Sequence, residues 1–362
     1  MNSYSIKGFD HCELYVSNAK QAAYYYRTAL GFLPIAYSGL ETGSRDRVSY
    51  VLKQNQVRFI LTSPLENNSE IGTHIYIHGD GIKDVSFTVD NAEAAWKEST
   101  KRGAESVLKP KLLTDDRGEA IVATIKAFGD TTHTFVQRNN YDGVFLPGYI
   151  VFEEDVLAEP TGLVHIDHVV GNQSDGEMQS VCNFYEKVFG WHRFWSVDDK
   201  DITTEFSALR SIVMANDNEI IKMPINEPAD GLNKSQIQEF IDYYKSAGIQ
   251  HVAMSTKDII KTVIKLRNNG VEFLDVPKTY YESLTDRVGE IDEDIIMLEE
   301  LGILVDKDNN GYMMQIFTKP VQDRPTLFYE IIQRRGSNSF GKGNFKALFE
   351  SIEREQEKRG NL

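Results

Sequence analysis

The chain has 362 residues, of which 41% are hydrophobic and 26% are charged, a composition typical of a folded protein with one or two domains. Its 39 basic and 54 acidic side chains give a net charge of -15, which repels phosphate backbones and excludes nucleic acid as an expected partner. The two cysteines stand alone in their segments, so we expect a reducing compartment without disulfides. No apolar signal segment and no membrane-spanning run occurs, which predicts a cytoplasmic protein without membrane contact.

A strand and helix pattern near the N-terminus recurs near the middle of the chain. In both places an apolar strand leads to an amphipathic helix that stops at a glycine followed by an aromatic residue. The first copy comprises residues 8–16, 22–30 and Gly31-Phe32, and the second comprises residues 164–170, 181–189 and Gly190-Trp191. An internal repeat is therefore the first organisational signal in this chain.

Two further matches follow in the same order. A strand, a helix and a closing glycine occupy Asp84 to Gly103 and His251 to Gly270, with helices expected at 92–101 and 259–267. Each copy then closes on an apolar strand ending in Gln-Arg, at Arg138 and at Arg334. The sequence therefore predicts an α+β fold of two homologous halves, residues 1–155 and 156–362, joined by an acidic, Pro/Gly-bearing connector at 153–162. Strands of paired modules in each half are expected to curl around a cavity.

The second half carries additional elements before its closing strand. Asp292 to Leu301 reads as a charged helix, and the turn from Asp306 to Gly311 separates two short apolar runs. This turn lacks the spaced ligands and closing glutamate of an EF-hand loop. We therefore expect a β-hairpin there.

Three ionisable residues occupy apolar faces of matched strands. Glu330 shares a face with Phe328 and Ile332, and strand alternation likewise places His251 and His168 among apolar neighbours. A buried charge needs a partner or a metal. If these strands line one cavity, they supply the two imidazoles and one carboxylate of a non-haem Fe(II) facial triad.

Each of these residues also has an ordinary interpretation. A single strand histidine is more often a hydrogen-bonded core residue, and Glu330 could pair with Arg334 or Arg335. The first half has His11, Asp84 and Thr134 at the corresponding positions, too few ligands for tight iron binding, so we expect it to be structural.

Other motifs compete with this site. His165-Ile166-Asp167 forms an H-x-D pair of the kind used by jelly-roll oxygenases, but the repeat has Gly8 where His165 stands. The glycine-rich segment 339–345 lacks the P-loop order and is expected to be a hinge into the final helix.

The final helix is expected to place Phe345, Leu348, Phe349 and Ile352 on one side, with a charged tail from Glu353 to Arg359 facing water. This pattern fits an ordinary packing helix. It also fits a lid that excludes water from the cavity.

Long strings across the chain carry a resemblance to one family. They include residues 221–228, 234–239, 248–253, 315–325, 341–345 and 359–362. In these strings the chain resembles the 4-hydroxyphenylpyruvate dioxygenases of the vicinal-oxygen-chelate superfamily. The resemblance covers nearly the whole chain and implies paired βαβββ modules forming glyoxalase-like half-barrels.

The resemblance also implies the chemistry of the site. Fe(II) would be bound by His168, His251 and Glu330, without 2-oxoglutarate or nicotinamide as cosubstrate. Polar and aromatic residues would surround the substrate, with Gln236, Gln250, Gln315 and Phe317 catalytic and Ser211, Asn226, Phe328, Phe340, Asn344 and Phe345 substrate-binding. Uncharged amides and phenyl rings suit an aromatic ring that carries a phenol.

The implied activity converts 4-hydroxyphenylpyruvate and O2 to homogentisate and CO2 in tyrosine and phenylalanine catabolism, by a homodimer or homotetramer. Two alternatives remain at this point. One is a hydroxymandelate synthase using the same substrate and metal, and the other is a metal-free protein of the same superfamily that binds a small molecule.

Overall fold

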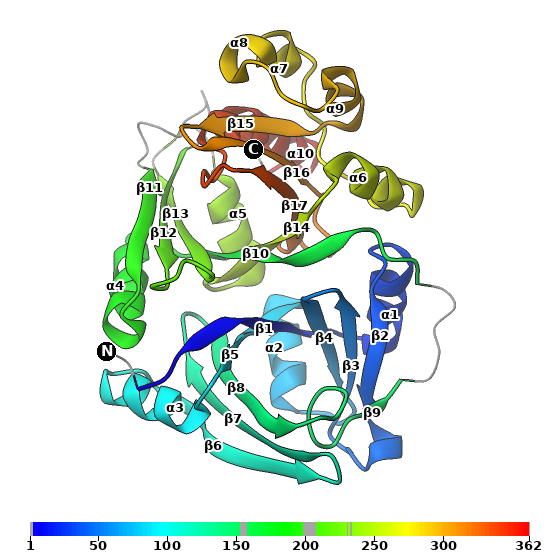
Figure 1. Cartoon of the computed structure of the whole chain (residues 1–362), viewed down its shortest axis with the longest axis vertical. Coiled ribbons are helices and arrows are strands. Elements are labelled where there is room, and N and C mark those ends of the chain that lie inside the picture. Colours follow the sequence, from blue (N-terminus) through cyan, green and yellow to red (C-terminus); the bar gives the residue numbers. More distant parts are fainter. Residues whose placement is uncertain (1–2, 153–157, 198–207, 230, 232–233, 362) are drawn as a thin grey trace.

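The computed structural model describes residues 3–152, 158–197, 208–229, 231 and 234–361. Two curled β-sheets lie one above the other, the first built from the N-terminal half and the second from the C-terminal half (Figure 1). The connector expected at 153–162 lies partly outside the described residues.

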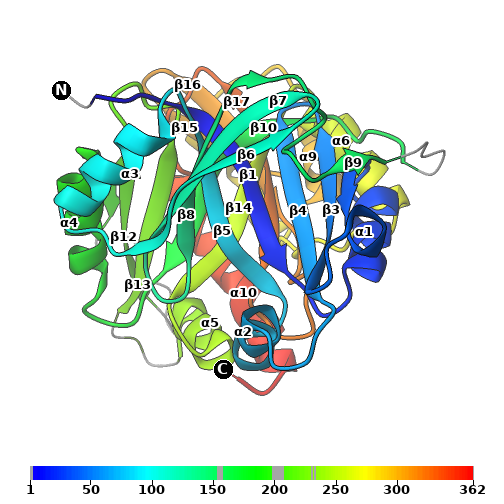
Figure 2. The same cartoon turned by 90° about the horizontal axis from the view of Figure 1, so that it is seen from below.

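The N-terminal sheet has the strand order β6-β7-β8-β5-β1-β4-β3-β2-β9. Its helices lie at the sides and lower end in the view of Figure 2. The elements in chain order are β1 (Ile6–Tyr15), α1 (Ala19–Thr28), β2 (Leu33–Ser38), η1 (Leu40–Thr42), β3 (Arg47–Gln54), β4 (Val57–Pro64), α2 (Glu70–His78), β5 (Gly81–Val89), α3 (Ala92–Lys101), β6 (Ser106–Asp115), β7 (Gly118–Lys126), β8 (Thr132–Tyr141) and β9 (Ile150–Val151).

The C-terminal sheet has the strand order β11-β12-β13-β10-β14-β17-β16-β15. Its elements are β10 (Leu163–Asn172), α4 (Met178–Phe189), β11 (His192–Val197), β12 (Ala208–Ala215), β13 (Lys222–Ala229), α5 (Gln236–Tyr244), β14 (Gly248–Thr256), α6 (Ile259–Asn268), α7 (Thr279–Glu282), α8 (Leu284–Val288), α9 (Ile295–Leu301), β15 (Leu304–Asp308), β16 (Gly311–Phe317), β17 (Phe328–Arg335), η2 (Lys342–Asn344) and α10 (Phe345–Lys358).

The two sheets repeat one pairing scheme, which confirms the predicted paired modules. In the first half β1 pairs parallel with β4 and antiparallel with β5, and β5 pairs parallel with β8. In the second half β10 pairs parallel with β13 and antiparallel with β14, and β14 pairs parallel with β17. The strand register also repeats. His11 opposes Ser86 in the first half, and their counterparts in the repeat, His168 and Ala253, oppose each other in the second half.

Local sequence signals set the helix bounds. Helices α3 and α6 begin where predicted, because the side chains of Asn91 and Asp258 accept hydrogen bonds from the free backbone N–H groups of the first turn. In the C-terminal insertion the β15–β16 hairpin was predicted correctly. The charged helix is shorter than expected, beginning at Ile295, and the short helices α7 and α8 were not predicted.

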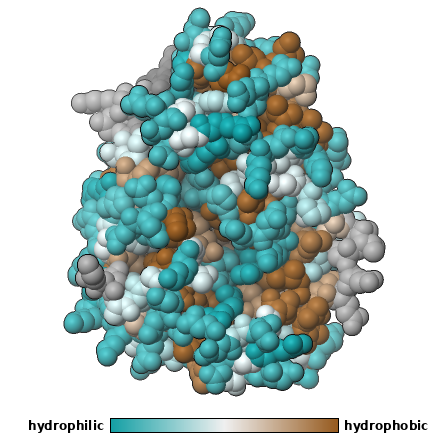
Figure 3. Space-filling model, viewed as in Figure 1, coloured by the Kyte–Doolittle hydropathy of each residue, from teal (hydrophilic) through white to brown (hydrophobic). Residues whose placement is uncertain are grey.

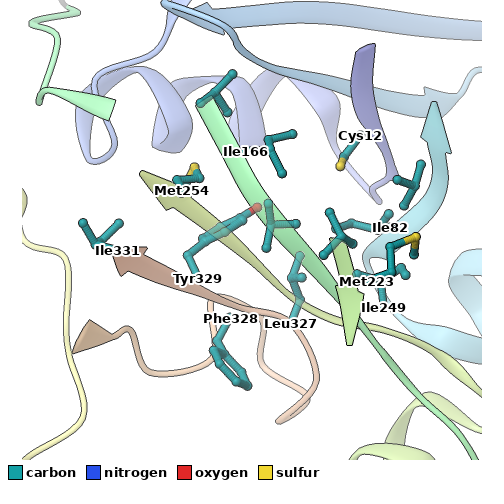
Figure 4. Packing of buried hydrophobic residues seen from close by; sticks show 14 of the residues in the cluster. Cys12, Ile82, Ile166, Met223, Ile249, Met254, Leu327, Phe328, Tyr329 and Ile331 are labelled. Atoms are coloured by element: carbon teal, nitrogen blue, oxygen red, sulfur yellow. The ribbon is translucent and has the colours of Figure 1, made fainter. Parts of the chain in front are cut away.

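Apolar side chains from both halves meet between the two sheets. Cys12 and Ile82 lie across from Ile166 and Tyr329 in one buried cluster (Figure 4). In the same figure the ring of Phe328, at the edge of the cluster, points to the opposite side of the strand from its neighbour Tyr329. Strand alternation therefore gives β17 one face for the core and the opposite face for a separate site.

Helix α10 corrects one expectation. Glu353 and Gln356 are buried, and Arg359 forms an ion pair with Glu239 of α5 at 2.8 Å. The charged tail therefore does not simply face water, because it packs on another helix whose carboxylate compensates the arginine.

The surface in Figure 3 is mostly hydrophilic, with scattered apolar groups, as a chain rich in charged residues requires. Within the described residues, the helices all lack the length and apolarity that crossing a bilayer demands.

Candidate metal centre and its pocket

Three neighbouring strands of the C-terminal sheet each contribute one ligand-type side chain to a common point. His168 comes from β10, His251 from β14 and Glu330 from β17. The Nε2 atoms of His168 and His251 lie 3.2 Å and 3.4 Å from Oε2 of Glu330. All three side chains are buried, with Glu330 only 3% exposed. The strand faces thus bring together the residues that alternation predicted.

Hydrogen bonds behind the two histidines orient their rings. Nδ1 of His168 lies 2.8 Å from a carboxylate oxygen of Asp167, and Arg334 donates two hydrogen bonds of 2.8 Å to that carboxylate. Nδ1 of His251 lies 3.1 Å from Oε1 of Gln250. Because each Nδ1 has an acceptor, Nε2 is the nitrogen that each ring directs at Glu330, which is the usual outer-shell arrangement of metal-binding histidines.

Burial and charge act in opposite directions on the titration of these groups. Burial favours the neutral acid of Glu330, but the charge and hydrogen bonds of His168 and His251 outweigh it and lower the pKa of Glu330 to about 2. Burial opposes charge on His168, yet Glu330 and Asp167 raise its pKa, whereas burial prevails at His251 and lowers its pKa. The centre therefore holds a carboxylate anion that attracts positive charge at neutral pH.

The donor set fits a divalent transition metal. One carboxylate oxygen and two imidazole nitrogens lie within 4.8 Å of one another. Imidazole and carboxylate in this ratio, on one side of a metal, leave coordination positions open for substrate and O2. A thiolate-rich structural zinc site is not formed here, because both cysteines are free, buried and lie on other elements.

A pocket adjoins the three ligands. Its walls come from the strands of the C-terminal sheet on one side and from α5 and α10 on the other. The lining residues are His168, Val170, Trp195, Leu209, Ser211, Val213, Pro224, Asn226, Gln236, Gln250, His251, Phe317, Phe328, Glu330, Phe340, Phe345, Leu348 and Phe349. Aromatic and aliphatic walls with a few uncharged polar groups are typical of a site for an aromatic small molecule.

Known proteins are similar to this chain in sequence and in fold. A model of the Glyoxalase/Bleomycin resistance protein/Dioxygenase superfamily matches residues 8–135 and again residues 165–316. A 4-hydroxyphenylpyruvate dioxygenase of Yarrowia lipolytica is 51% identical over 99% of this chain and 94% of its own length. One of Dictyostelium discoideum is also 51% identical, over 99% of this chain and all of its own length. The chain belongs to the 4-hydroxyphenylpyruvate dioxygenase family.

A solved structure shares the fold of this chain. A triple mutant of 4-hydroxymandelate synthase from Streptomyces coelicolor superposes with a TM-score of 0.87 at 32% identity, covering 97% of this chain and 99% of the other. The family model's two matches correspond to the two halves of the predicted duplication. As a member of the family the chain is a dioxygenase with a metal cofactor, and His168, His251 and Glu330 form a group that could hold the metal.

Two alternatives for the ligand residues are excluded by the geometry. Arg334 binds Asp167 and Arg335 binds Glu293, so neither arginine is the partner of Glu330. The H-x-D pair is not a ligand pair either, because His165 lies 2.8 Å from Ser255 and Asp167 instead braces His168.

Most of the other pocket residues expected from the sequence line the pocket, and two do not. Gln315 is buried against Gly341, where a Cβ atom would approach its side chain to 2.5 Å. Asn344 is buried outside the pocket lining, and its Oδ1 accepts a hydrogen bond of 2.6 Å from Tyr280. Both residues therefore hold the segment that leads into α10 rather than forming the pocket wall.

Four wall residues were missed by the sequence analysis: Val170, Trp195, Leu209 and Val213. Three of them had a signal, because Val170 lies two residues after His168, and Leu209 and Val213 flank Ser211 at the same spacing. Side chains two residues apart on a strand share a face. Trp195 had no such signal, since only the approach of β11 to Phe340 and Phe345 places it at the pocket.

Proposed function

We propose that this chain is an Fe(II)-dependent dioxygenase that converts 4-hydroxyphenylpyruvate and O2 to homogentisate and CO2 in tyrosine and phenylalanine catabolism. The observation that carries the proposal is the pocket that joins the His168, His251 and Glu330 ligand set to phenylalanine walls and uncharged amides. Fe(II) bound by these three side chains would offer open coordination positions to the substrate and O2.

The composition of the pocket wall supports a 2-oxo acid as substrate. None of the described lining residues is a lysine or an arginine, so the carboxylate of the substrate has no cationic side chain to bind. If the carboxylate and keto oxygens of the substrate point at the metal centre, a bound metal would compensate the negative charge that no side chain neutralises. The substrate's acid end is thereby oriented toward His168, His251 and Glu330.

Aromatic side chains then hold the ring of the substrate. Phe328 stacks on the His251 ring at 4.7 Å, and Phe317 meets the same ring edge-on at 6.2 Å. A substrate ring bound beside these residues makes offset or edge contacts of the kind aromatic groups prefer. Holding the ring close to the reacting centre is the main contribution of the protein to the rate.

Polar groups at the other side of the pocket suit a phenol. Ser211 and Asn226 oppose each other across β12 and β13, and Gln236 begins α5 beside them. These uncharged side chains donate and accept hydrogen bonds without favouring an anion. They therefore orient a neutral phenolic hydroxyl.

Helix α10 excludes water from this pocket. Phe345, Leu348 and Phe349 cover it, and Trp195 lies at 6.0 Å from the Phe345 ring. A dry pocket keeps the reactive oxygen species formed during turnover away from solvent.

In the same proposal, residues 1–155 form a structural half and residues 156–362 form the catalytic half. The protein is cytoplasmic and forms a homodimer or a homotetramer. Light scattering of the purified protein tests the oligomeric state.

A 4-hydroxymandelate synthase activity is the second candidate, because a protein of that name is 32% identical to this chain. Ring attack requires the phenyl group near the metal, whereas attack on the side chain requires the benzylic carbon there. Pro224, Asn226 and Phe317 are the wall residues expected to hold the ring for homogentisate formation. A difference of about 1.4 kcal/mol between the two barriers changes the product ratio tenfold.

One experiment distinguishes these outcomes. The protein is loaded with Fe(II) without oxygen, mixed with 4-hydroxyphenylpyruvate and exposed to air, and the products of one turnover are separated by chromatography. We expect homogentisate with one O2 consumed per product. A majority of 4-hydroxymandelate would replace the proposed product, and absence of turnover with full iron would reject the enzyme proposal.

A further inference from the structure

A second cluster of ligand-type side chains lies in the N-terminal half. His74 and His78 are one helical turn apart on α2, and Asp130 lies in the loop between β7 and β8. One ligand atom from each of the three lies within 4.8 Å of the others. Both histidines are buried, whereas the Asp130 side chain is 50% exposed. The cluster therefore has a route to solvent through Asp130.

Both ring nitrogens of His78 face oxygen acceptors, but a neutral imidazole can donate a hydrogen bond to only one of them. Its Nδ1 lies 2.5 Å from the backbone oxygen of Tyr244, and its Nε2 lies 2.8 Å from Oδ2 of Asp130. A neutral imidazole has one N–H donor. With Nδ1–H donated to the carbonyl, Nε2 meets the carboxylate either as a second N–H of a charged ring or as a ligand of a shared cation.

His74 supplies a further nitrogen. Its ring centroid is 4.5 Å from that of His78, and its Nε2 is 3.5 Å from the Tyr244 hydroxyl, a marginal hydrogen bond. The ring is buried beside His78 and is only 5% exposed, so it is shielded from bulk water. The ring is also held in place edge-on by Tyr15 at 5.3 Å.

Among the surrounding charges one lysine faces two carboxylates, so one negative charge is in excess. Lys83 donates a hydrogen bond of 2.7 Å to the backbone oxygen of Asp130 and lies 3.9 Å from Glu70, one turn before His74. Its positive charge opposes a cation, while Asp130 and Glu70 favour one. Because two of the three donor groups are imidazoles, we expect the site to bind a metal with strong affinity for nitrogen ligands. Ca²⁺ and Mg²⁺ prefer oxygen ligands and are not expected.

We propose that His74, His78 and Asp130 form a second divalent-metal site, of the zinc type, separate from the His168, His251 and Glu330 centre. Two imidazoles, a carboxylate and one water complete the tetrahedral set that Zn²⁺ prefers. The carbonyl of Tyr244 holds Nδ1 of His78 as an outer-shell acceptor does in such sites.

The position of this site gives it a structural consequence. Helix α2 and the β7–β8 loop belong to the N-terminal half, whereas Tyr244 ends α5 of the C-terminal half, and α2 packs beside α5 (Figures 1 and 2). Helix α5 begins at the pocket residue Gln236. A metal bound here would fix the ring of His78, whose Nδ1 contacts the backbone oxygen of Tyr244 at the end of α5, so its occupancy should raise the thermal stability of the contact between the halves.

Metal counting on the iron-loaded protein tests the proposal. The protein is loaded with Fe(II) without oxygen, mixed with a small excess of Zn²⁺, freed of unbound metal by gel filtration and analysed for both elements. We expect one iron and one zinc per chain, with a rise in melting temperature on zinc addition. A Co²⁺ replacement of the zinc should give the intense visible absorption of a four-coordinate site.

Two variants and one control assign the zinc to this cluster. His74→Gln and Asp130→Asn should each bind at least tenfold less zinc, keep one iron and lose the zinc-dependent rise in melting temperature. His192→Gln is the matched control, because His192 is an exposed histidine 3.9 Å from the carboxylate of Glu219, and it should bind both metals.

Asp130→Asn is expected to fold even if His74→Gln does not, because the Asp130 side chain is half-exposed, so loss of zinc in this variant can be assigned to the ligand. Zinc that only displaces iron, zinc retained by both variants, or no zinc bound beyond the iron would each overturn the proposal. In the last case the cluster is a charged His78–Asp130 ion pair that serves packing alone.

Discussion

The two halves keep the same support for a histidine but differ in what that histidine faces. In the C-terminal half Asp167 and Arg334 brace His168, and the Phe340 ring lies over the arginine at 5.5 Å. In the N-terminal half Asp10 lies 2.6 Å from Nδ1 of His11, Arg138 binds Asp10, and Phe145 lies over that arginine at 5.0 Å. The aspartate, histidine, arginine and phenylalanine set is thus part of the duplicated fold itself.

The metal-facing positions of the two halves are different. Where the C-terminal half has His251 and Glu330, the N-terminal half has Asp84 and Thr134. Nε2 of His11 lies 2.9 Å from the Ser86 hydroxyl, and Thr134 donates a hydrogen bond of 2.8 Å to Asp84. Because these groups satisfy one another, the N-terminal counterpart is a closed polar network. We infer from this comparison that the brace stabilises the fold, whereas the two positions held by His251 and Glu330 decide whether a metal can bind.

The largest expected effect comes from removing the carboxylate of Glu330, whose position in the N-terminal half is occupied by Thr134. Glu330→Gln should abolish iron binding and turnover while the protein stays folded, because the loss of one ligand leaves two imidazoles and no anion. Iron analysis, O2 uptake and circular dichroism measure the three properties. Thr134→Val at the matching position is the control and should retain both iron and turnover. Stoichiometric iron with full activity in the glutamine variant would reject the ligand assignment.

The brace can be tested by the same substitution in both halves. Asp167→Asn and Asp10→Asn should each destabilise the fold by about 1–3 kcal/mol, because a partly buried arginine loses its charged hydrogen-bond partner. Only Asp167→Asn should also weaken iron binding, by about 10–100-fold, as outer-shell changes do. Denaturant unfolding and iron titration separate the two effects. Equal loss of iron affinity in both variants would mean that the halves are coupled rather than divided by role.

The N-terminal brace should also give the protein an acid sensitivity. Burial opposes ionisation of Asp10, but His11 and Arg138 outweigh it and lower its pKa well below its ordinary value of 3.8. A group with a depressed folded pKa stabilises the fold above its unfolded pKa, and this contribution is lost as pH falls through 3.8 toward the folded value. Comparing the unfolding free energy of the unmodified chain and Asp10→Asn between pH 3 and pH 7 checks this. Their difference should shrink at the acid end.

Removing the cover of the catalytic half should have a smaller effect. Truncation before Gly341 should leave a folded, iron-binding protein with weaker substrate binding and more O2 consumed without product, because the pocket is open to water. Phe349→Ala should show the same change in milder form, and Lys346→Ala, whose side chain is 78% exposed, should not. The ratio of product to O2 consumed is the measurement. An unchanged ratio in the truncated protein would remove the lid role.

The smallest effect is expected at His11. His11→Ala should lower activity little, since its half offers Asp84 and Thr134 in place of the missing ligands. Any loss should appear as a lower melting temperature, because His11 is buried between Asp10 and Ser86. Complete loss of iron with the fold intact would show that the wrong half had been assigned to the metal.

The sequence by itself determined the duplication, the helices begun by Asn91 and Asp258, and the strand faces on which His168, His251 and Glu330 converge. These properties depend on local signals: side-chain alternation along a strand, capping at a helix start and the order of similar segments in one chain. The family resemblance added most of the pocket wall, including Asn226 and Phe317.

Only the tertiary structure decided which distant groups meet. Asp167 binds Arg334 rather than leaving that arginine for Glu330, Gln315 packs on Gly341, and Glu353 is buried where a charged tail suggested exposure. His74, His78 and Asp130 meet because a helix and a loop of one half close on a helix of the other. Such contacts join residues far apart in the chain, so the local periodicity that places a side chain on a face cannot select its partner.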